Sequence, residues 1–261
     1  MRLERSLGHW ILVRSIAKRS RWQILVRREL REGLRELFEW CAPLGCATCG
    51  ERAGRDAVCS RCRDRLEAMP VAGCARCGEQ LTPDGRCLAD HRPLRGVDAR
   101  VAPFRYRGAA GGAVRRFKFL ADPAAEAFLV RSLTLRLLAS RAVERSMLVM
   151  SVPMHARKRR RRGRDPAAEL AAAVADGLGL AFDSGGLRRT VDTLPQADPR
   201  VLSRARNVEG VFELRRGVEV QGRTVLLIDD VSTSGATASA CARVLRRQGA
   251  RRVVVGIACV G

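Results

Sequence analysis

Paired cysteines limit how the first part of this chain can fold. Cys46 and Cys49 in "CATC" and Cys59 and Cys62 in "CSRC" form a C-x2-C-x9-C-x2-C quartet. Each pair offers two thiolates from one tight knuckle, and four thiolates complete a closed tetrahedral zinc site. Such a site has no open coordination position, so we predict that its zinc stabilises the fold and does not catalyse.

A second set of cysteines repeats the first. Cys74, Cys77 and Cys87 follow the first three ligands at a constant offset of 28 residues, and "CATCGE" is echoed by "CARCGE". The repeat puts the fourth ligand at Asp90, with His91 beside it. We favour His91, because imidazole suits zinc better than a lone carboxylate among thiolates. The alternative for both sets is that the thiols are merely buried or redox-active.

Composition indicates a folded, soluble protein. Hydrophobic residues make up 46% of the 261 residues, yet no uncharged apolar run reaches the roughly 18 residues that a membrane-spanning helix needs. The early stretch "LGHWILV" is interrupted by Arg14 and lacks a cleavage site, so we expect a cytoplasmic protein, in which cysteine pairs favour metal over disulfides. We divide the chain into a basic helical or partly disordered extension (1–40), a double zinc-ribbon module (41–95) and a larger domain (96–261).

Aliphatic runs alternate with helical patterns in the larger domain. "DARVAPFRYRG", "MLVMSVP", "TVLLIDD" and "RRVVVGIACV" are typical of strands. Helices are expected near residues 123–140, over "DPAAELAAAVADGLGL" and over "ASACARVLRRQG". This order predicts an α/β fold with a parallel sheet covered on both faces, with Cys241 and Cys259 in its core.

Two adjacent carboxylates close one of these strands. Asp229 and Asp230 follow the apolar run Val225 to Ile228, and ligands bind at the carboxyl edge of open α/β sheets. The alternative is that the acids pair with arginines or cap the next helix. Two in succession can accept hydrogen bonds from adjacent sugar hydroxyls and hold Mg²⁺ directly or through water.

The residues after the acid pair suit a phosphate. Thr233, Ser234 and Thr237 supply hydroxyls, and Gly235 lets backbone N–H groups approach an anion. The following helix directs its positive end at the same place. An apolar strand, an acid pair and this loop together predict a site for a phosphorylated ribose.

At this point the segment "VLLIDDVSTSGAT" resembles the signature with which type I phosphoribosyltransferases bind phosphoribosyl pyrophosphate (PRPP). The resemblance implies that Asp229 and Asp230 contact the ribose hydroxyls together with Mg²⁺. It also implies that the 5'-phosphate is held by the loop residues Thr233, Ser234, Gly235, Ala236 and Thr237.

Further segments of the chain make the resemblance more specific. The cysteine pairs, "FKF", "SVPMHARKRRRRG", "LRRTVDTLPQ" and "RARNVEGVFEL" resemble the competence ComF family over roughly residues 41–261. Members of that family have a double zinc ribbon and a phosphoribosyltransferase-like domain, and they serve uptake of single-stranded DNA in natural transformation. The resemblance implies PRPP, single-stranded DNA and a competence helicase as partners, and it puts Val152 and Pro153 on the pyrophosphate side. Lys118, flanked by two Phe residues, either places its charge against a phosphate on that side or is a helix lysine whose end reaches solvent. Relatives usually read Gly-Phe-Asn-Gln where this chain has "GRDP" (163–166), which puts acceptor binding in doubt.

Basic residues give the chain a formal net charge of +22, which attracts phosphates and nucleic acid. Arg157–Arg162 and Arg164 follow the "SVPMH" strand, either as a solvated basic loop or as an anion contact. Residues 188–206 read as a mobile loop that closes over an anionic ligand. His155 and His9 are isolated, so no histidine is expected to act as a general base.

The sequence leaves three functions open. The first is a PRPP- and Mg²⁺-binding phosphoribosyltransferase-like protein that serves DNA uptake. The second is a non-catalytic protein of the same fold that binds single-stranded DNA through its zinc ribbons and arginines. The third is a salvage enzyme that transfers the phosphoribosyl group to a nucleobase or amine, with the acceptor unspecified.

Overall fold

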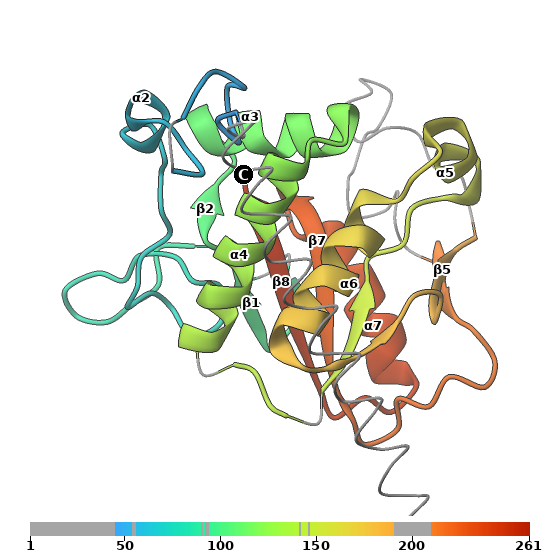
Figure 1. Ribbon diagram of the computed structural model, residues 1–261. Helices are drawn as coiled ribbons and strands as arrows, with labels where there is room; N and C mark the ends of the chain where they lie inside the picture. Colours follow the sequence, from blue (N-terminus) through green and yellow to red (C-terminus); the bar gives the residue numbers. More distant parts are fainter. Residues whose placement is uncertain are drawn as a thin grey trace, which may run out of the picture.

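A parallel sheet forms the centre of the fold, as the alternation of aliphatic and helical segments predicts. The strand order is β1-β8-β7-β3-β4, β2 also pairs with β8, and every pairing is parallel (Figure 1). The strands are β1 (Ala99–Val101), β2 (Phe104–Arg105), β3 (Leu148–Ser151), β4 (Ala181–Asp183), β7 (Thr224–Ser232) and β8 (Arg252–Val260). The predicted parallel α/β fold is confirmed.

The computed structural model describes residues 45–53, 56–89, 91, 94–140, 142–145, 147–190 and 210–261. The extension 1–40, Cys41, Asp90 and the larger part of the predicted mobile loop (191–206) lie outside the described residues. Within them, no helix is long and apolar enough to cross a membrane.

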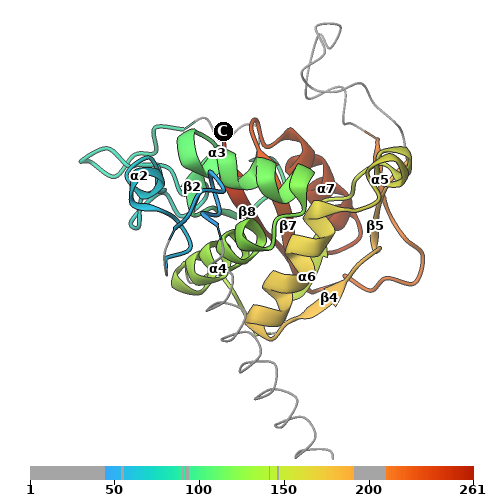
Figure 2. The same ribbon diagram turned by 45° about the horizontal axis from the view of Figure 1, so that its top comes forward.

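Helices cover both faces of the sheet. One face carries α3 (Gly108–Arg115), α4 (Pro123–Ala139) and α6 (Pro166–Leu178), and Figure 2 shows α4 and α6 in front of β7 and β8. A π-helical turn, η2 (Arg116–Leu120), connects α3 to α4. The opposite face carries α7 (Ala236–Arg247). Shorter elements are α2 (Ser60–Arg63), α5 (Ala156–Arg162) and the antiparallel pair β5 (Leu187–Arg189) and β6 (Phe212–Leu214).

Local signals set the helix ends where the sequence predicts them. The Asp165 side chain accepts a hydrogen bond from the backbone N–H of Ala168, and Pro166 begins α6. Gly179, with φ 65°, ends α6 in the left-handed conformation that favours glycine. Asp122 caps α4 in the same way as Asp165 caps α6.

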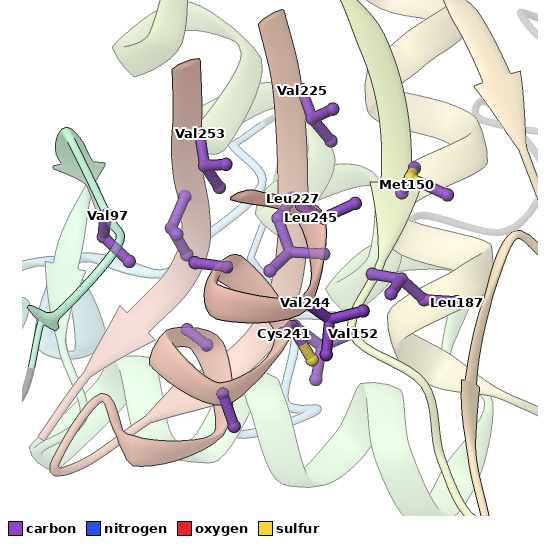
Figure 3. Close-up of a cluster of buried hydrophobic side chains, with 14 of the residues drawn as sticks. Val97, Met150, Val152, Leu187, Val225, Leu227, Cys241, Val244, Leu245 and Val253 are labelled. Atoms are coloured by element: carbon purple, nitrogen blue, oxygen red, sulfur yellow. The ribbon is translucent and has the colours of Figure 1, made fainter. Parts of the chain in front are cut away.

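The side chains of β7 alternate between the two faces of the sheet. Val225 and Leu227 pack with Cys241 and Leu245 of α7, as Figure 3 shows. Leu226 and Ile228 instead pack in the cluster formed by α3, α4 and α6. Because successive strand residues point to opposite faces, the residues that follow Ile228 continue this alternation.

The predicted cysteine module packs against the sheet domain. Glu79, beside the second set of cysteines, forms ion pairs with Arg100 of β1 (3.6 Å) and Arg105 of β2 (2.6 Å). Arg100 is 9% exposed, and its Nε donates to the carbonyl oxygen of Cys77 (3.1 Å). Met69 and Leu94 are buried in the same core cluster as α7.

Three expectations about local structure need correction. β7 continues past Asp229 and Asp230 to Ser232, because its pairing with β8 extends to Val260, so the acid pair lies inside the strand. The basic run 157–162 is the helix α5 rather than a loop, capped by His155 and ended by Gly163. Arg189 belongs to β5, so the predicted mobile loop begins later than residue 188.

Candidate functional site

The first cysteine cluster brings its four predicted ligands together. The Sγ atoms of Cys46, Cys49, Cys59 and Cys62 all lie within 4.8 Å of one another, and Cys49 and Cys59 are 3.9 Å apart. Thiolates bound to one tetrahedral zinc at about 2.3 Å would stand at similar separations. The donor set therefore fits zinc.

The second cluster joins Cys74, Cys77 and Cys87 to His91. His91 Nε2 lies 3.2 Å from Cys77 Sγ and 3.5 Å from Cys74 Sγ, and the Cys77 and Cys87 sulfurs are 3.4 Å apart. The structure thus brings in His91, the ligand that the chemistry of zinc favours. Three sulfurs and one imidazole nitrogen also fit zinc.

The repeat of 28 residues extends to the backbone of the knuckles. Gly50 and Gly78 both adopt positive φ, at 81° and 75°. A Cβ at Gly45 would stand 2.6 Å from the Gly50 oxygen, and a Cβ at Gly73 would stand 2.3 Å from the Gly78 oxygen. Only glycine tolerates these approaches, so the two knuckles share one backbone design.

The thiols of the first cluster differ in acidity. Burial opposes ionisation of Cys46, but hydrogen bonds from Thr48 and from backbone groups outweigh it and lower its pKa to about 5. Burial raises the pKa of Cys62 to about 12. Without metal the cluster therefore holds one thiolate readily, while zinc binding would displace further protons.

The acid pair is buried near the carboxyl end of β7, a strand in the middle of the sheet. Asp229 is 9% exposed and Asp230 7%. The Asp229 carboxylate accepts from the backbone N–H of Asp230 (2.9 Å), and the Asp230 carboxylate accepts from that of Val231 (2.6 Å). These bonds fix both carboxylates against their own strand.

The two carboxylates have different neighbours. The pKa of the Cys241 thiol in α7 is raised, mainly by burial and secondly by the charge of Asp229. The pKa of the Cys259 thiol in β8 is raised to about 12, mainly by burial and secondly by the charge of Asp230. This division follows the alternation of β7, because Cys241 packs in the α7 cluster and Cys259 in the α3–α4–α6 cluster. Asp229 and Asp230 thus serve opposite faces of the sheet.

Lys118 contacts the acid pair directly. Its Nζ lies 2.9 Å from Asp230 Oδ1, and the Lys118 side chain is only 22% exposed. Lys118 was expected on the pyrophosphate side of the site, and the structure places its ammonium against the acid pair. Sequence reasoning missed this contact, because the two residues are far apart in the chain and belong to different elements.

The pKa of Asp229 lies well above its ordinary value, chiefly because of burial and then because of the Asp230 carboxylate. The folded protein therefore holds this proton to higher pH than the unfolded chain does. As pH rises from about 4 through the raised folded pKa, the free energy of unfolding falls, because the buried carboxylate must ionise.

Replacing Asp229 with asparagine should consequently stabilise the ligand-free protein. We expect a melting temperature about 3 °C higher at pH 8, equivalent to ~1 kcal/mol, and a smaller gain at pH 4. Thermal unfolding at both pH values measures this. Asp176→Asn, on the exposed side of α6, is the control. An equal gain at both pH values, or a loss, would contradict the burial argument.

The phosphate-binding candidates follow the end of β7 and lead into α7. Thr233, Ser234 and Gly235 form the turn, Gly235 has φ 75°, and Ala236 and Thr237 begin α7. The Ala236 N–H donates to Ser234 Oγ at 3.4 Å. Since Gly235 is the N-cap residue and has no side chain, no side-chain cap from it covers the first turn of α7.

Val152 and Pro153 directly follow β3, the strand that pairs with β7. β3 runs parallel to β7, Ser151 is in register with Ile228, and the Val152 N–H donates to the Ile228 carbonyl (2.8 Å). The chain leaves β3 at this point towards α5. The buried carboxylates, the hydroxyl-bearing turn and the α7 N-terminus together supply the oxygen ligands that suit Mg²⁺ and the N–H donors that suit a phosphate.

The "GRDP" segment has a structural use in this chain. The Arg164 guanidinium pairs with Glu169, and its Nη1 donates to the carbonyl oxygen of Phe117 at 2.8 Å. Asp165 caps α6, and Pro166 starts it. The segment therefore ties α6 to η2.

No family model matches the chain. The chain is 31% identical over 207 residues to the DNA utilization protein YhgH of Salmonella typhimurium, and 30% identical over 206 residues to that of Escherichia coli (strain K12). Each alignment covers 78% of this chain and 88% of the relative.

Solved structures with some likeness include glutamine PRPP amidotransferase from B. subtilis (21% identity, TM-score 0.36) and adenine phosphoribosyltransferase from Saccharomyces cerevisiae (15% identity, TM-score 0.37). These matches cover 56% and 55% of this chain, and 30% and 72% of the respective solved chains. The chain thus spans less than a third of the amidotransferase. From the sequence matches, the chain belongs to the family of the DNA utilization protein YhgH.

Proposed function

We propose that the chain binds PRPP with Mg²⁺ at the end of β7 as a phosphoribosyltransferase-like protein that serves DNA uptake. The observation that carries this proposal is the pair of buried carboxylates, Asp229 and Asp230, next to the start of α7, whose N-cap residue Gly235 supplies no side-chain cap. Buried charges are costly unless they are paired or bind a metal. A ligand with hydroxyls, a metal and a phosphate would use every group that this edge offers.

Each residue would have a distinct role. The acid pair would accept hydrogen bonds from the ribose hydroxyls and hold the metal, directly or through water. The turn Thr233–Gly235 and the first N–H groups of Ala236 and Thr237 would hold the 5'-phosphate. Val152 and Pro153 would border the pyrophosphate. Mg²⁺, when bound, neutralises the charge of the departing pyrophosphate.

A transferase reaction would need little more from the protein than position and charge. A nucleophile would attack the anomeric carbon while pyrophosphate leaves, and the basic residues near β3 would stabilise that leaving group. The acceptor would be a nucleobase or an amine in a salvage enzyme, and the departure from the ComF pattern at "GRDP" bears on acceptor binding rather than on PRPP binding.

Calorimetry tests the site. PRPP with Mg²⁺ is titrated into the parent protein and into the variant Asp229→Asn, Asp230→Asn. We expect the variant to bind at least about thirtyfold more weakly, because charge-assisted hydrogen bonds to both carboxylates are lost. Asp84→Asn, an exposed change in the second knuckle, should bind as the parent does. Equal binding by parent and double variant would refute the site.

A second candidate function is binding of single-stranded DNA. It is favoured by α5, a helix whose residues 157–162 are all basic and exposed. The relatives carry the name DNA utilization protein, and the ComF resemblance adds uptake of single strands with a helicase partner. We propose that α5 contacts the phosphate backbone without reading sequence. Screening for pyrophosphate release with candidate acceptors separates an enzyme from a binding protein.

The cysteine clusters would support either function as structural sites. We propose one zinc in each cluster, a module boundary near residue 95 and a cytoplasmic location. The clusters lie in the part of the chain that packs on β1, β2 and α3, so zinc would hold one wall of the domain.

A further inference from the structure

Lys118 gives the acid pair a resident counterion. Its Nζ lies 2.9 Å from Asp230 Oδ1, with the two side chains 22% and 11% exposed. Asp230 therefore already has a cation at Oδ1, one of the two carboxylate oxygens that a metal or a ribose hydroxyl could contact. Asp229 lies on the other side of the strand, where burial and the charge of Asp230 disfavour its ionised form and the charge of Lys118 partly offsets them.

Packing holds the turn that carries Lys118 in place over the sheet. η2 is a π-helical turn, a type that is rare and often found at functional sites. Phe117 is fully buried and anchors the turn, and Arg164 both donates to its carbonyl oxygen and lies 5.1 Å over its ring. Ala121 closes the turn in the left-handed region, with φ 51°, which costs energy for a residue with a Cβ.

The end of this turn beyond Lys118 is exposed to solvent. Phe119 is 66% exposed and Leu120 is 64% exposed, and the Arg162 guanidinium lies over the Phe119 ring at 5.1 Å. Lys118 therefore stands between an anchored residue and an exposed one. Its long side chain can leave Asp230 by rotation about its own bonds while Phe117 keeps the turn in place.

We propose that Lys118 is a displaceable counterion that makes the acid pair select a metal complex of a phosphorylated ligand over the bare metal. This inference rests on the proposed PRPP site. A divalent cation alone must break the ion pair between the Lys118 ammonium and Asp230, and it brings no anion to replace that partner. A metal–PRPP complex brings phosphate oxygens that can accept the released ammonium, so the exchange of partners is balanced.

Two affinities should move in opposite directions when Lys118 is replaced by methionine. Binding of Mn²⁺ alone, followed by electron paramagnetic resonance, should become about tenfold tighter, since a counterion no longer competes. Binding of Mg²⁺–PRPP should become about tenfold weaker, since the phosphate loses its ammonium partner. Arg131→Met, which removes the same charge from the exposed side of α4, should change neither by more than about twofold.

A double variant tells whether the effect acts through Asp230. In Lys118→Met, Asp230→Asn, the gain in Mn²⁺ affinity should disappear, because the released carboxylate is no longer there. Unchanged Mn²⁺ affinity in the folded Lys118→Met variant overturns the counterion role, whatever PRPP does. If the parent binds no PRPP while the variant still gains Mn²⁺ affinity, the proposed function fails and the counterion role stands.

Amine acylation tests the same exchange in the unaltered chain. The chain has three lysines, Lys18, Lys118 and Lys158. Peptide mass spectrometry should find Lys118 modified more slowly than the exposed Lys158 in the metal-free protein. Saturating Mn²⁺ should raise the rate at Lys118 several-fold and leave Lys158 unchanged. A Lys118 rate that Mn²⁺ does not raise overturns the displacement.

Discussion

Removing zinc from the two cysteine clusters should lower the melting temperature by about 10–20 °C. Structural zinc contributes folding free energy outright, and a loss of ~5 kcal/mol corresponds to a shift of this size in a chain of this length. The metal-free clusters would be left with buried thiols of raised pKa, such as those of Cys62 and Cys77.

The loss should spread beyond the knuckles, because the first cluster packs tightly on the helices. A Cβ at Gly112 of α3 would stand 2.6 Å from the Thr48 carbonyl oxygen, which leaves no space between the knuckle and the helix. Ala47, Val58, Ala109 and Ala124 are buried together in this contact. We therefore expect hydrogen exchange to speed up in residues 45–64 and in α3, while β7 and β8 stay protected.

Metal analysis and calorimetry check this expectation. The purified protein should hold two zinc ions per chain, and chelation followed by added zinc should lower and then restore the melting temperature. Cys49→Ser, at an exposed ligand, should lose one zinc, whereas Cys49→His keeps a zinc ligand and should retain it. A melting temperature unchanged after complete removal of metal would show that the clusters do not stabilise the fold.

Replacing three basic residues of α5 with glutamine should weaken binding of single-stranded DNA by about a hundredfold at 0.1 M salt. Each neutralised phosphate contributes a slope of about −0.7 to the dependence of log K on log salt concentration for single strands. The variant Lys158→Gln, Arg160→Gln, Arg161→Gln should thus have a slope shallower by about 2. Glutamine preserves helix propensity, so α5 should persist.

The choice of positions separates charge from structure. Arg162 and Arg164 are kept because their guanidinium groups lie over Phe119 and Phe117. A control variant removes three exposed arginines elsewhere, Arg131, Arg216 and Arg247, and leaves the net charge equal to that of the α5 variant. Fluorescence anisotropy with labelled oligonucleotides over a series of salt concentrations measures both. Equal losses in the two variants would mean that net charge alone, rather than α5, attracts the DNA.

Much of the fold could be predicted because its signals are local. The apolar run before Asp229, the proline and glycine at the ends of α6 and the cysteine spacing each depend on neighbours in the chain. The extent of β7 could not be predicted in this way. Its last residues stay in the sheet because they pair with β8 as far as Val260, and that pairing joins segments distant in sequence.

The misjudged elements show which forces outweighed local charge. Consecutive basic side chains repel one another, which favours a loop for residues 157–162. The helix forms because His155 Nδ1 accepts from the Arg157 N–H at 3.3 Å and Gly163, with φ 74°, ends it. The ion pair of Lys118 with Asp230 had no signal at all, because it depends on how a π-helical turn packs over the sheet.

The alternating side chains of β7 also restrict which mutations this strand can accept. A substitution within Val225 to Ile228 changes packing on one face, and the remaining residues keep their positions. Inserting or deleting one codon there would turn Asp229 towards Cys259 and Asp230 towards Cys241, with both carboxylates still present. Homologues that keep this site should therefore differ by substitutions within Val225 to Ile228 and have the same number of residues there.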